Sequence, residues 1–89
     1  MLERDIVVSN RLGLHARASA KLVQLVATFK STVLIISKGR EVNAQSIMGV
    51  MMLAAGMGTA LQIRSEGDDE EAALQAVVDL FDRKFDEGA

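Results

Sequence analysis

A histidine and an arginine two positions apart, His15 and Arg17, have the clearest chemical potential in this sequence. His15 is the only histidine of the chain. A neutral imidazole is abundant near neutral pH and is a good nucleophile. A guanidinium group can hold two oxygens of a phosphate at once. The pair therefore indicates an acceptor site for a phosphoryl group.

An amphipathic helix is predicted to begin directly after His15. Apolar residues recur at three- and four-residue spacing, and polar residues fall on the opposite face. The repeat consists of Leu22, Leu25, Val26 and Phe29. Because Gly13 supplies a flexible backbone just before the helix, we expect His15 at its N-cap. The first turn of a helix leaves N–H groups unpaired and carries partial positive charge, which stabilises an anion. A His-x-Arg pair alone is weakly specific, so a His15 that only caps the helix is the alternative.

The composition is that of one small globular domain covering residues 1–89. Ten basic and twelve acidic residues give a formal net charge of -2, so no overall basic charge attracts nucleic acid or anionic lipid. The chain has no cysteine, and its single histidine argues against a metal site. We expect no cofactor. The first residues do not resemble a signal peptide, and no stretch approaches the roughly twenty apolar residues that span a bilayer. A cytoplasmic protein without membrane contact is the expectation.

The remaining patterns predict four strands and two further helices. The strands are expected at residues 2–8, 32–36, 40–43 and 61–66. The second strand is apolar on both faces, which is typical of a buried position, whereas the third is short and polar, which suits an edge. The element order is βαββαβα. One-sided alternation along the strands predicts an α+β fold, a four-stranded antiparallel sheet with all three helices on one face.

The second helix is predicted to begin at Ser46, a residue that is favoured at N-caps. Its predicted buried face consists of Ile47, Val50, Met51 and Ala54. Met48 and Met52 fall off this face and would form a soft apolar surface, with ordinary packing as the alternative.

The last helix is preceded by a run of four acids. Within this run, Asp68 and Glu71 have the spacing of a capping box. The predicted buried side of the helix consists of Leu74, Val77, Val78, Phe81 and Phe85. Gly88 and Ala89 are expected to form a frayed tail.

Two separate segments match one known family. They are Asn10-Arg11-Leu12-Gly13-Leu14-His15-Ala16-Arg17 and Asn43-Ala44-Gln45-Ser46-Ile47-Met48-Gly49-Val50-Met51. In sequence and spacing they closely resemble HPr, the histidine-containing phosphocarrier family of the bacterial phosphotransferase system. The resemblance extends over essentially the whole chain. It implies an open-faced β-sandwich, in agreement with the element order predicted above.

The resemblance also implies a function for individual residues. In this family the histidine that His15 matches is phosphorylated on Nδ1 by Enzyme I, which takes the phosphoryl group from phosphoenolpyruvate, and the group then passes to enzyme IIA domains. The chain would thus be a monomeric carrier and not a self-sufficient enzyme, with Arg17 stabilising the phosphate. Ser46 matches a serine that is phosphorylated in many bacteria by HPr kinase/phosphorylase. The residues expected to dock these partners are Ile47, Met48 and Met51.

Two positions depart from the family pattern. Ala18 stands where proline is usual, which is expected to loosen the start of the helix slightly without affecting the chemistry. Gln45 stands where many members carry a basic residue, and this neutral side chain is expected to weaken kinase docking or the electrostatic support of a phosphate on Ser46.

Three other readings stay open at this point. A nitrogen-branch or regulatory relative of HPr would carry the same motifs, because the acceptor depends on which IIA partners are present. A non-catalytic binding domain would use the same surface, with His15 only as a cap. An RNA-binding module would need exposed aromatic residues or a basic stripe, and the three phenylalanines all lie on predicted core faces.

Overall fold

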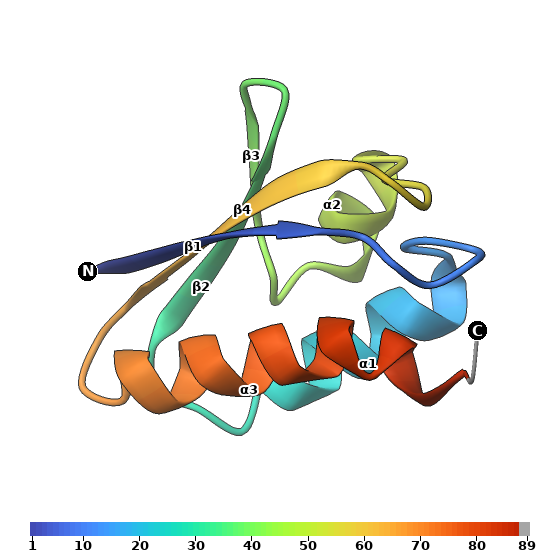
Figure 1. Ribbon diagram of the computed structural model, residues 1–89. Coiled ribbons are helices and arrows are strands. Elements are labelled where there is room, and N and C mark those ends of the chain that lie inside the picture. The colour runs from blue at the N-terminus through green and yellow to red at the C-terminus, as the bar shows by residue number, and fades with distance from the viewer. Residues whose placement is uncertain (88–89) are drawn as a thin grey trace.

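The computed structural model describes residues 1–87, so the predicted tail at Gly88 and Ala89 lies outside the described residues. Its elements are, in order, β1 (Leu2–Val7), α1 (Ala16–Val26), β2 (Thr32–Ser37), β3 (Arg40–Asn43), α2 (Ile47–Met52), β4 (Ala60–Glu66), α3 (Glu70–Asp82) and a 3-10 turn, η1 (Lys84–Asp86). This order confirms the predicted βαββαβα arrangement. Figure 1 shows the long helices α1 and α3 running beneath the sheet, with α2 at one end.

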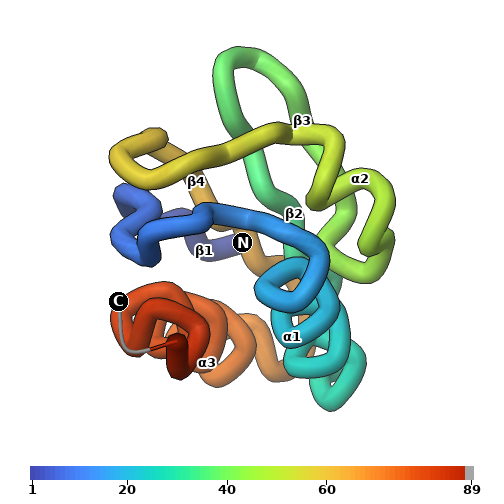
Figure 2. Tube along the Cα trace, turned by 90° about the vertical axis from the view of Figure 1, so that its right-hand side faces the viewer, coloured from blue at the N-terminus to red at the C-terminus, as the bar shows by residue number. Residues whose placement is uncertain are grey.

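The four strands form one antiparallel sheet in the order β1-β4-β2-β3. The apolar strand β2 is central, where Ile35 faces Ile63 of β4 on one side and Val42 of β3 on the other. The short polar strand β3 lies at an edge, as predicted, and β1 forms the other edge. The twist of the sheet and the layer of helices on one side are visible in Figure 2. The predicted α+β open-faced sandwich is therefore confirmed.

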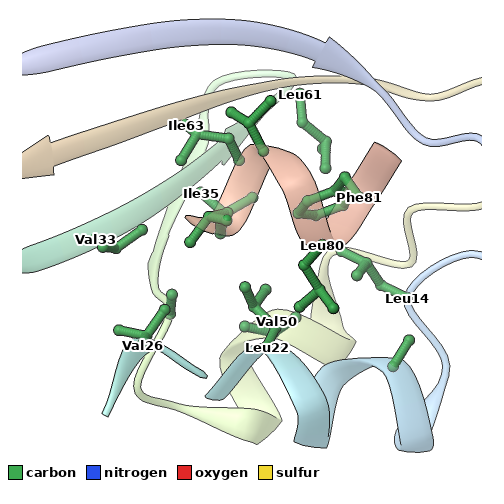
Figure 3. Close-up of a cluster of buried hydrophobic side chains, with 14 of the residues drawn as sticks. Leu14, Leu22, Val26, Val33, Ile35, Val50, Leu61, Ile63, Leu80 and Phe81 are labelled. Carbon is green, nitrogen blue, oxygen red and sulfur yellow. The ribbon is translucent and has the colours of Figure 1, made fainter. Parts of the chain in front are cut away.

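The hydrophobic core lies between the sheet and the helices. Alternate residues of the central strands point toward the helices and are buried, because successive side chains of a strand face opposite sides. The buried apolar residues of these strands are Val33, Ile35, Leu61 and Ile63. The helices contribute Leu22, Val26, Val50, Leu80 and Phe81, which meet the strand residues in Figure 3. On the open face of the sheet Arg64 forms ion pairs with Glu3 and Glu41, so this face is polar and solvated.

Helix α1 is shorter than its apolar repeat. It ends at Val26, and the following residues turn through i to i+3 bonds from Thr28 N–H to the Leu25 carbonyl and from Phe29 N–H to the Val26 carbonyl. Phe29 still packs against the core from this turn. Of the repeat, Leu22 and Val26 are buried and Leu25 and Phe29 partly buried, whereas the buried residues Ala18 and Ser19 lie outside it. The repeat therefore identified the core-facing side only in part, and it overstated the length of the helix.

The predicted buried face of α2 is largely wrong. Only Val50 is buried in this helix, whereas Ile47 and Met51 are 40% and 41% exposed. The physical reason is that α2 has six residues and lies at the end of the sheet, where it contacts α1 and β3 with one narrow face. Met48 and Met52 are exposed, as predicted. The helix therefore presents more apolar surface to solvent than its sequence suggested.

The predicted capping box at the start of α3 is also wrong. The N-cap is Asp69, and its side chain makes no capping bond. Instead the Asp69 carboxylate accepts hydrogen bonds from the Ser31 hydroxyl and from the backbone N–H groups of Lys30 and Ser31. The Ser31 hydroxyl and the Lys30 N–H hold the pKa of Asp69 below its usual value. The carboxylate thus anchors the segment between α1 and β2, a long-range contact that local spacing does not reveal.

The end of the chain departs from the predicted helix as well. Helix α3 ends at Asp82, and Phe85 follows in the 3-10 turn with φ of 55°. Phe85 is nevertheless fully buried, and its ring packs edge-on against Phe81 with 4.8 Å between centroids. This turn carries the next residues back toward the beginning of α1.

Candidate functional site

His15 is the N-cap of α1, as the sequence predicted. Its backbone is extended (φ -74°, ψ -179°), and its Nδ1 accepts the backbone N–H of Arg17 at 3.2 Å. The side chain is 27% exposed, so a reagent can reach the ring from solvent. The ring lies at the positive end of an eleven-residue helix, whose first turn leaves backbone N–H groups without partners in the helix.

The loop before His15 is fixed by a close approach to the end of α2. Gly13 has φ of 65°, and a Cβ at this position would come within 2.3 Å of the Ala55 carbonyl oxygen. The same carbonyl accepts the N–H of Leu14 at 2.9 Å. Gly13 is therefore required both by its backbone conformation and by the space available. This contact ties the histidine loop to the segment after α2.

The other ring nitrogen of His15 contacts the C-terminal segment. Nε2 forms a hydrogen bond with Oε2 of Glu87. Oε1 of Glu87 accepts a hydrogen bond from Nδ2 of Asn10 at 3.2 Å, and the same amide donates to the Gly13 carbonyl at 2.8 Å. The ammonium of Lys21 donates to the Phe85 carbonyl at 2.7 Å. His15 is thus held between the first turn of α1 and a carboxylate from the far end of the chain.

The charge of Glu87 is favoured by its neighbours. Partial burial acts to raise the pKa of Glu87, but the hydrogen bonds from His15 and Asn10 and the positive charge of Lys21 outweigh it. The net result is a pKa of Glu87 below its usual value. Glu87 is accordingly an anion at neutral pH, directly against the imidazole.

A shallow hollow surrounds the histidine. It is lined by Arg11, Leu12, His15, Arg17 and Glu87. Arg17 is exposed, and none of the ion pairs among residues 1–87 involves Arg11 or Arg17. Both guanidinium groups are therefore available to an anionic group at His15. The structure brings His15 and Arg17 to one site, and it adds two residues that the sequence did not single out as site residues, Arg11 and Glu87.

A second helix start carries Ser46. Its hydroxyl accepts the N–H of Gly49 at 3.0 Å, so Ser46 is the N-cap of α2, as predicted. The residue is exposed. Helices α1 and α2 contact each other, and Figure 1 shows α2 above the beginning of α1 at the same end of the molecule. The large apolar side chains exposed here are Leu12, Ile47, Met48, Met51 and Met52.

Within residues 1–87, no group of three or more histidine, cysteine, aspartate or glutamate side chains is arranged to hold a metal ion. In the same part of the chain no helix is long and apolar enough to cross a membrane.

These observations define a class of protein: an open-faced β-sandwich with a partly exposed histidine at a helix N-terminus, beside free cations, which suits a small carrier of phosphoryl groups. A family model described as "PTS HPr component phosphorylation site" matches residues 2–83. The chain belongs to the HPr family of phosphocarrier proteins.

Individual relatives agree with this assignment. The chain is 55% identical to phosphocarrier protein HPr of Xylella fastidiosa strain 9a5c, over 98% of each chain. It is 41% identical to phosphocarrier protein NPr of Shewanella violacea, over 99% of this chain and 97% of that one. The crystal structure of HPr-C-His from Thermoanaerobacter tengcongensis superposes with a TM-score of 0.94 at 44% identity, over 98% of each chain.

Sequence reasoning missed Glu87 because Phe85 fits the helical repeat of α3. Phe85 lies four residues after Phe81, the spacing of a helix face. That spacing placed Phe85 on a continuing helix. The helix in fact ends before a run of three residues with positive φ, 84–86. No local sequence pattern predicts this run.

Proposed function

We propose that this protein accepts a phosphoryl group on Nδ1 of His15 from Enzyme I and passes it to enzyme IIA domains. The observation that carries the proposal is the position of Nδ1 at the positive end of α1, against the N–H of Arg17. An anion at this atom would gain hydrogen bonds from the first turn and charge stabilisation from the Arg17 guanidinium.

The proposed mechanism needs positioning more than covalent machinery. Phosphoryl transfer has a loose transition state, so a carrier has to align its nucleophile with the donor and stabilise the phosphoryl oxygens. In the free protein the Arg17 N–H is bonded to Nδ1. When Nδ1 bonds to phosphorus, this N–H becomes available to a phosphoryl oxygen. The remaining groups of the reaction come from the clefts of the partners, which is why the protein is a carrier.

The apolar surface of α2 is the proposed docking site for these partners. Ile47, Met48 and Met51 are exposed beside the histidine end of the molecule. Flexible thioether side chains can repack against different surfaces, which suits a carrier that meets Enzyme I and IIA domains in turn. We also propose that the protein is monomeric and cytoplasmic, which suits a carrier that dissociates from its partner after each transfer.

The proposed regulation at Ser46 would act through charge. A phosphate there would add about -1.5 to -2 charges at a helix start that tolerates them. We expect it to repel partners and not to unfold the chain. Gln45 offers no positive charge to a phosphate or to HPr kinase/phosphorylase.

The second candidate is a nitrogen-branch or regulatory carrier, which the 41% identity to an NPr favours. Its phosphoryl chemistry would be the same, and only the partners would differ. The two candidates are separated by offering the phosphorylated protein a sugar-specific and a nitrogen-branch IIA domain in parallel.

The relay can be tested as a whole with phosphoenolpyruvate, Enzyme I and a IIA domain. Enzyme I should release pyruvate in proportion to the IIA domain added, but only when this protein is present. His15→Ala serves as the control. With this variant, pyruvate release should stop once Enzyme I itself is phosphorylated. Pyruvate release at the same level with His15→Ala would contradict the proposal and favour a non-catalytic binding domain.

A further inference from the structure

We propose that Glu87 is a positioning residue for His15: it holds the ring proton on Nε2, keeps the lone pair of Nδ1 free for phosphorus, and balances the ring charge after transfer. This inference rests on the proposed carrier function. It adds to that function a residue from the opposite end of the chain.

The two contacts of the imidazole determine where its proton lies. A backbone N–H can only donate, so Nδ1, which receives the Arg17 N–H, must present its lone pair. A neutral imidazole carries one proton, which then lies on Nε2. Nε2 faces the Glu87 carboxylate, which can only accept. The two contacts therefore favour the same tautomer, the one in which Nδ1 is the nucleophile.

The carboxylate of Glu87 is placed by contacts that surround it. Phe85 is buried against Phe81 and anchors the turn, while Lys21 of α1 donates to the Phe85 carbonyl. Asn10, which is fully buried, donates to the second carboxylate oxygen. The side chain of Glu87 is only 17% exposed. Because these contacts hold the carboxylate in place, little conformational entropy remains to be lost when it supports the ring.

The charge balance of the transfer step shows what the carboxylate contributes. The lone pair of Nδ1 forms the new bond to phosphorus, and the bond from phosphorus to the donor atom of Enzyme I breaks, with its electron pair staying on the donor. The ring of His15 keeps the proton on Nε2 and thus becomes cationic. Glu87 lies against that proton as a counter-ion.

The other charged groups at the hollow have the opposite sign. Arg11 lies on the loop before His15, and Arg17 lies on α1. Lys21, also on α1, contacts the turn that holds Glu87. These cations favour the phosphate but disfavour a cationic ring. Glu87 is the one anionic side chain lining the hollow among residues 1–87, so the ring charge depends on it.

The test compares Glu87→Ala, Glu87→Gln and the matched control Asp86→Asn. The amide of Gln keeps an acceptor for Nε2 but removes the charge. Asp86→Asn removes the same charge one residue away, from a side chain that pairs with Arg83 and not with His15. The first readout is the NMR resonance of the ring N–H, which a hydrogen bond protects from exchange with water. The second is the equilibrium constant for phosphorylation by Enzyme I and phosphoenolpyruvate.

Glu87→Ala should lose the protected N–H resonance and lower the equilibrium constant by roughly five- to tenfold, because the hydrogen bond from Nε2 to the carboxylate becomes stronger when the ring turns cationic. Glu87→Gln should keep the resonance and lower the constant to a similar extent. Asp86→Asn should change neither. An unchanged resonance and constant in Glu87→Ala would overturn the proposal, as would an equal loss in Asp86→Asn.

The NMR experiment needs no phosphoryl donor. If the wild-type protein shows the protected N–H but is never phosphorylated, the proposed function fails while the contact stands. If phosphorylation is normal and Glu87→Ala leaves both readouts unchanged, only the role of Glu87 fails.

Discussion

Helices α1 and α2 begin with the same kind of N-cap hydrogen bond, but the contacts around the two N-cap residues differ. Each has an N-cap side chain that accepts a nearby backbone N–H: His15 from Arg17, and Ser46 from Gly49. His15 is also held by Glu87, which comes from the other end of the chain, and it shares a hollow with two arginines. Ser46 is exposed and is followed by a helix of only six residues.

This difference supports the proposal that the start of α1, and not the start of α2, is the reactive one. An N-cap by itself satisfies an orphan backbone group and needs no further function. The start of α1 goes beyond capping, because the first turn of α1 and the segment that carries Glu87 both contact one imidazole. The start of α2 is explained by capping alone, and its modification would act through added charge and not through a prepared site.

The largest effect is expected from removing the cation beside His15. Arg17→Ala should slow phosphoryl acceptance from Enzyme I by roughly ten- to hundredfold, because a charge-assisted hydrogen bond to the phosphate is lost. Rapid-quench kinetics would measure the rate. Arg17→Lys keeps the charge but loses the two-pronged geometry, so its rate should lie in between. A wild-type rate in Arg17→Ala would remove the main distinction between the two helix starts.

A charge at Ser46 should have the next largest effect. Ser46→Asp should slow phosphoryl acceptance by about tenfold through repulsion of the partner, with stability unchanged because aspartate is also a good N-cap. Ser46→Asn provides the matched control, since asparagine caps equally well without charge. Urea unfolding would check stability in both variants. Equal rates for Ser46→Asp and the wild type would contradict regulation through charge.

The apolar surface of α2 offers a smaller but separate test. Met48, which is 69% exposed, should contact partners without supporting the core. Met48→Asp should weaken binding to Enzyme I by roughly tenfold, a typical loss for an important interface residue. Met48→Leu keeps the apolar contact and should bind nearly as well. Unchanged affinity of Met48→Asp in calorimetry would show that this part of α2 does not dock Enzyme I.

The smallest effect is expected at Ala54, in the segment after α2 that contacts the histidine loop. Ala54 has φ of 51°, and it precedes Ala55, whose carbonyl holds the histidine loop through Leu14. A left-handed conformation costs a non-glycine residue about 1 kcal/mol, part of which the greater freedom of glycine in the unfolded chain offsets. Ala54→Gly should therefore raise the free energy of unfolding by about 0.5 kcal/mol without changing the phosphorylation rate. A loss of stability in thermal unfolding would show that Ala54 is not strained.

Local periodicity accounts for what the sequence predicted well. The alternation of Leu61, Ile63 and Ser65 gave the buried face of β4, and the position of His15 before an apolar repeat gave the N-cap. These features depend on neighbours within one turn or one strand. Two predictions about side chains at other helix starts were wrong because they depend on distant parts of the chain. Asp69 bonds to Ser31, and Ile47 is exposed because α2 lies at the end of the sheet.

The most informative contact was also the least predictable. Glu87 is 72 positions from His15 in the chain, and its approach depends on residues with positive φ after α3. Neither residue type nor spacing signals such a reversal when Phe85 continues the helical pattern. Contacts between the two ends of a chain require the folded structure.

The central claim is that His15 accepts a phosphoryl group, and intact-mass spectrometry tests it most directly. The wild-type protein and His15→Ala would each be mixed with Enzyme I and phosphoenolpyruvate and measured at neutral to basic pH, because acid hydrolyses phosphohistidine. The wild type should gain the mass of one phosphate and lose it on acid treatment. His15→Ala should gain no phosphate. No gain in the wild type with a competent Enzyme I, or an equal gain in His15→Ala, would contradict the account.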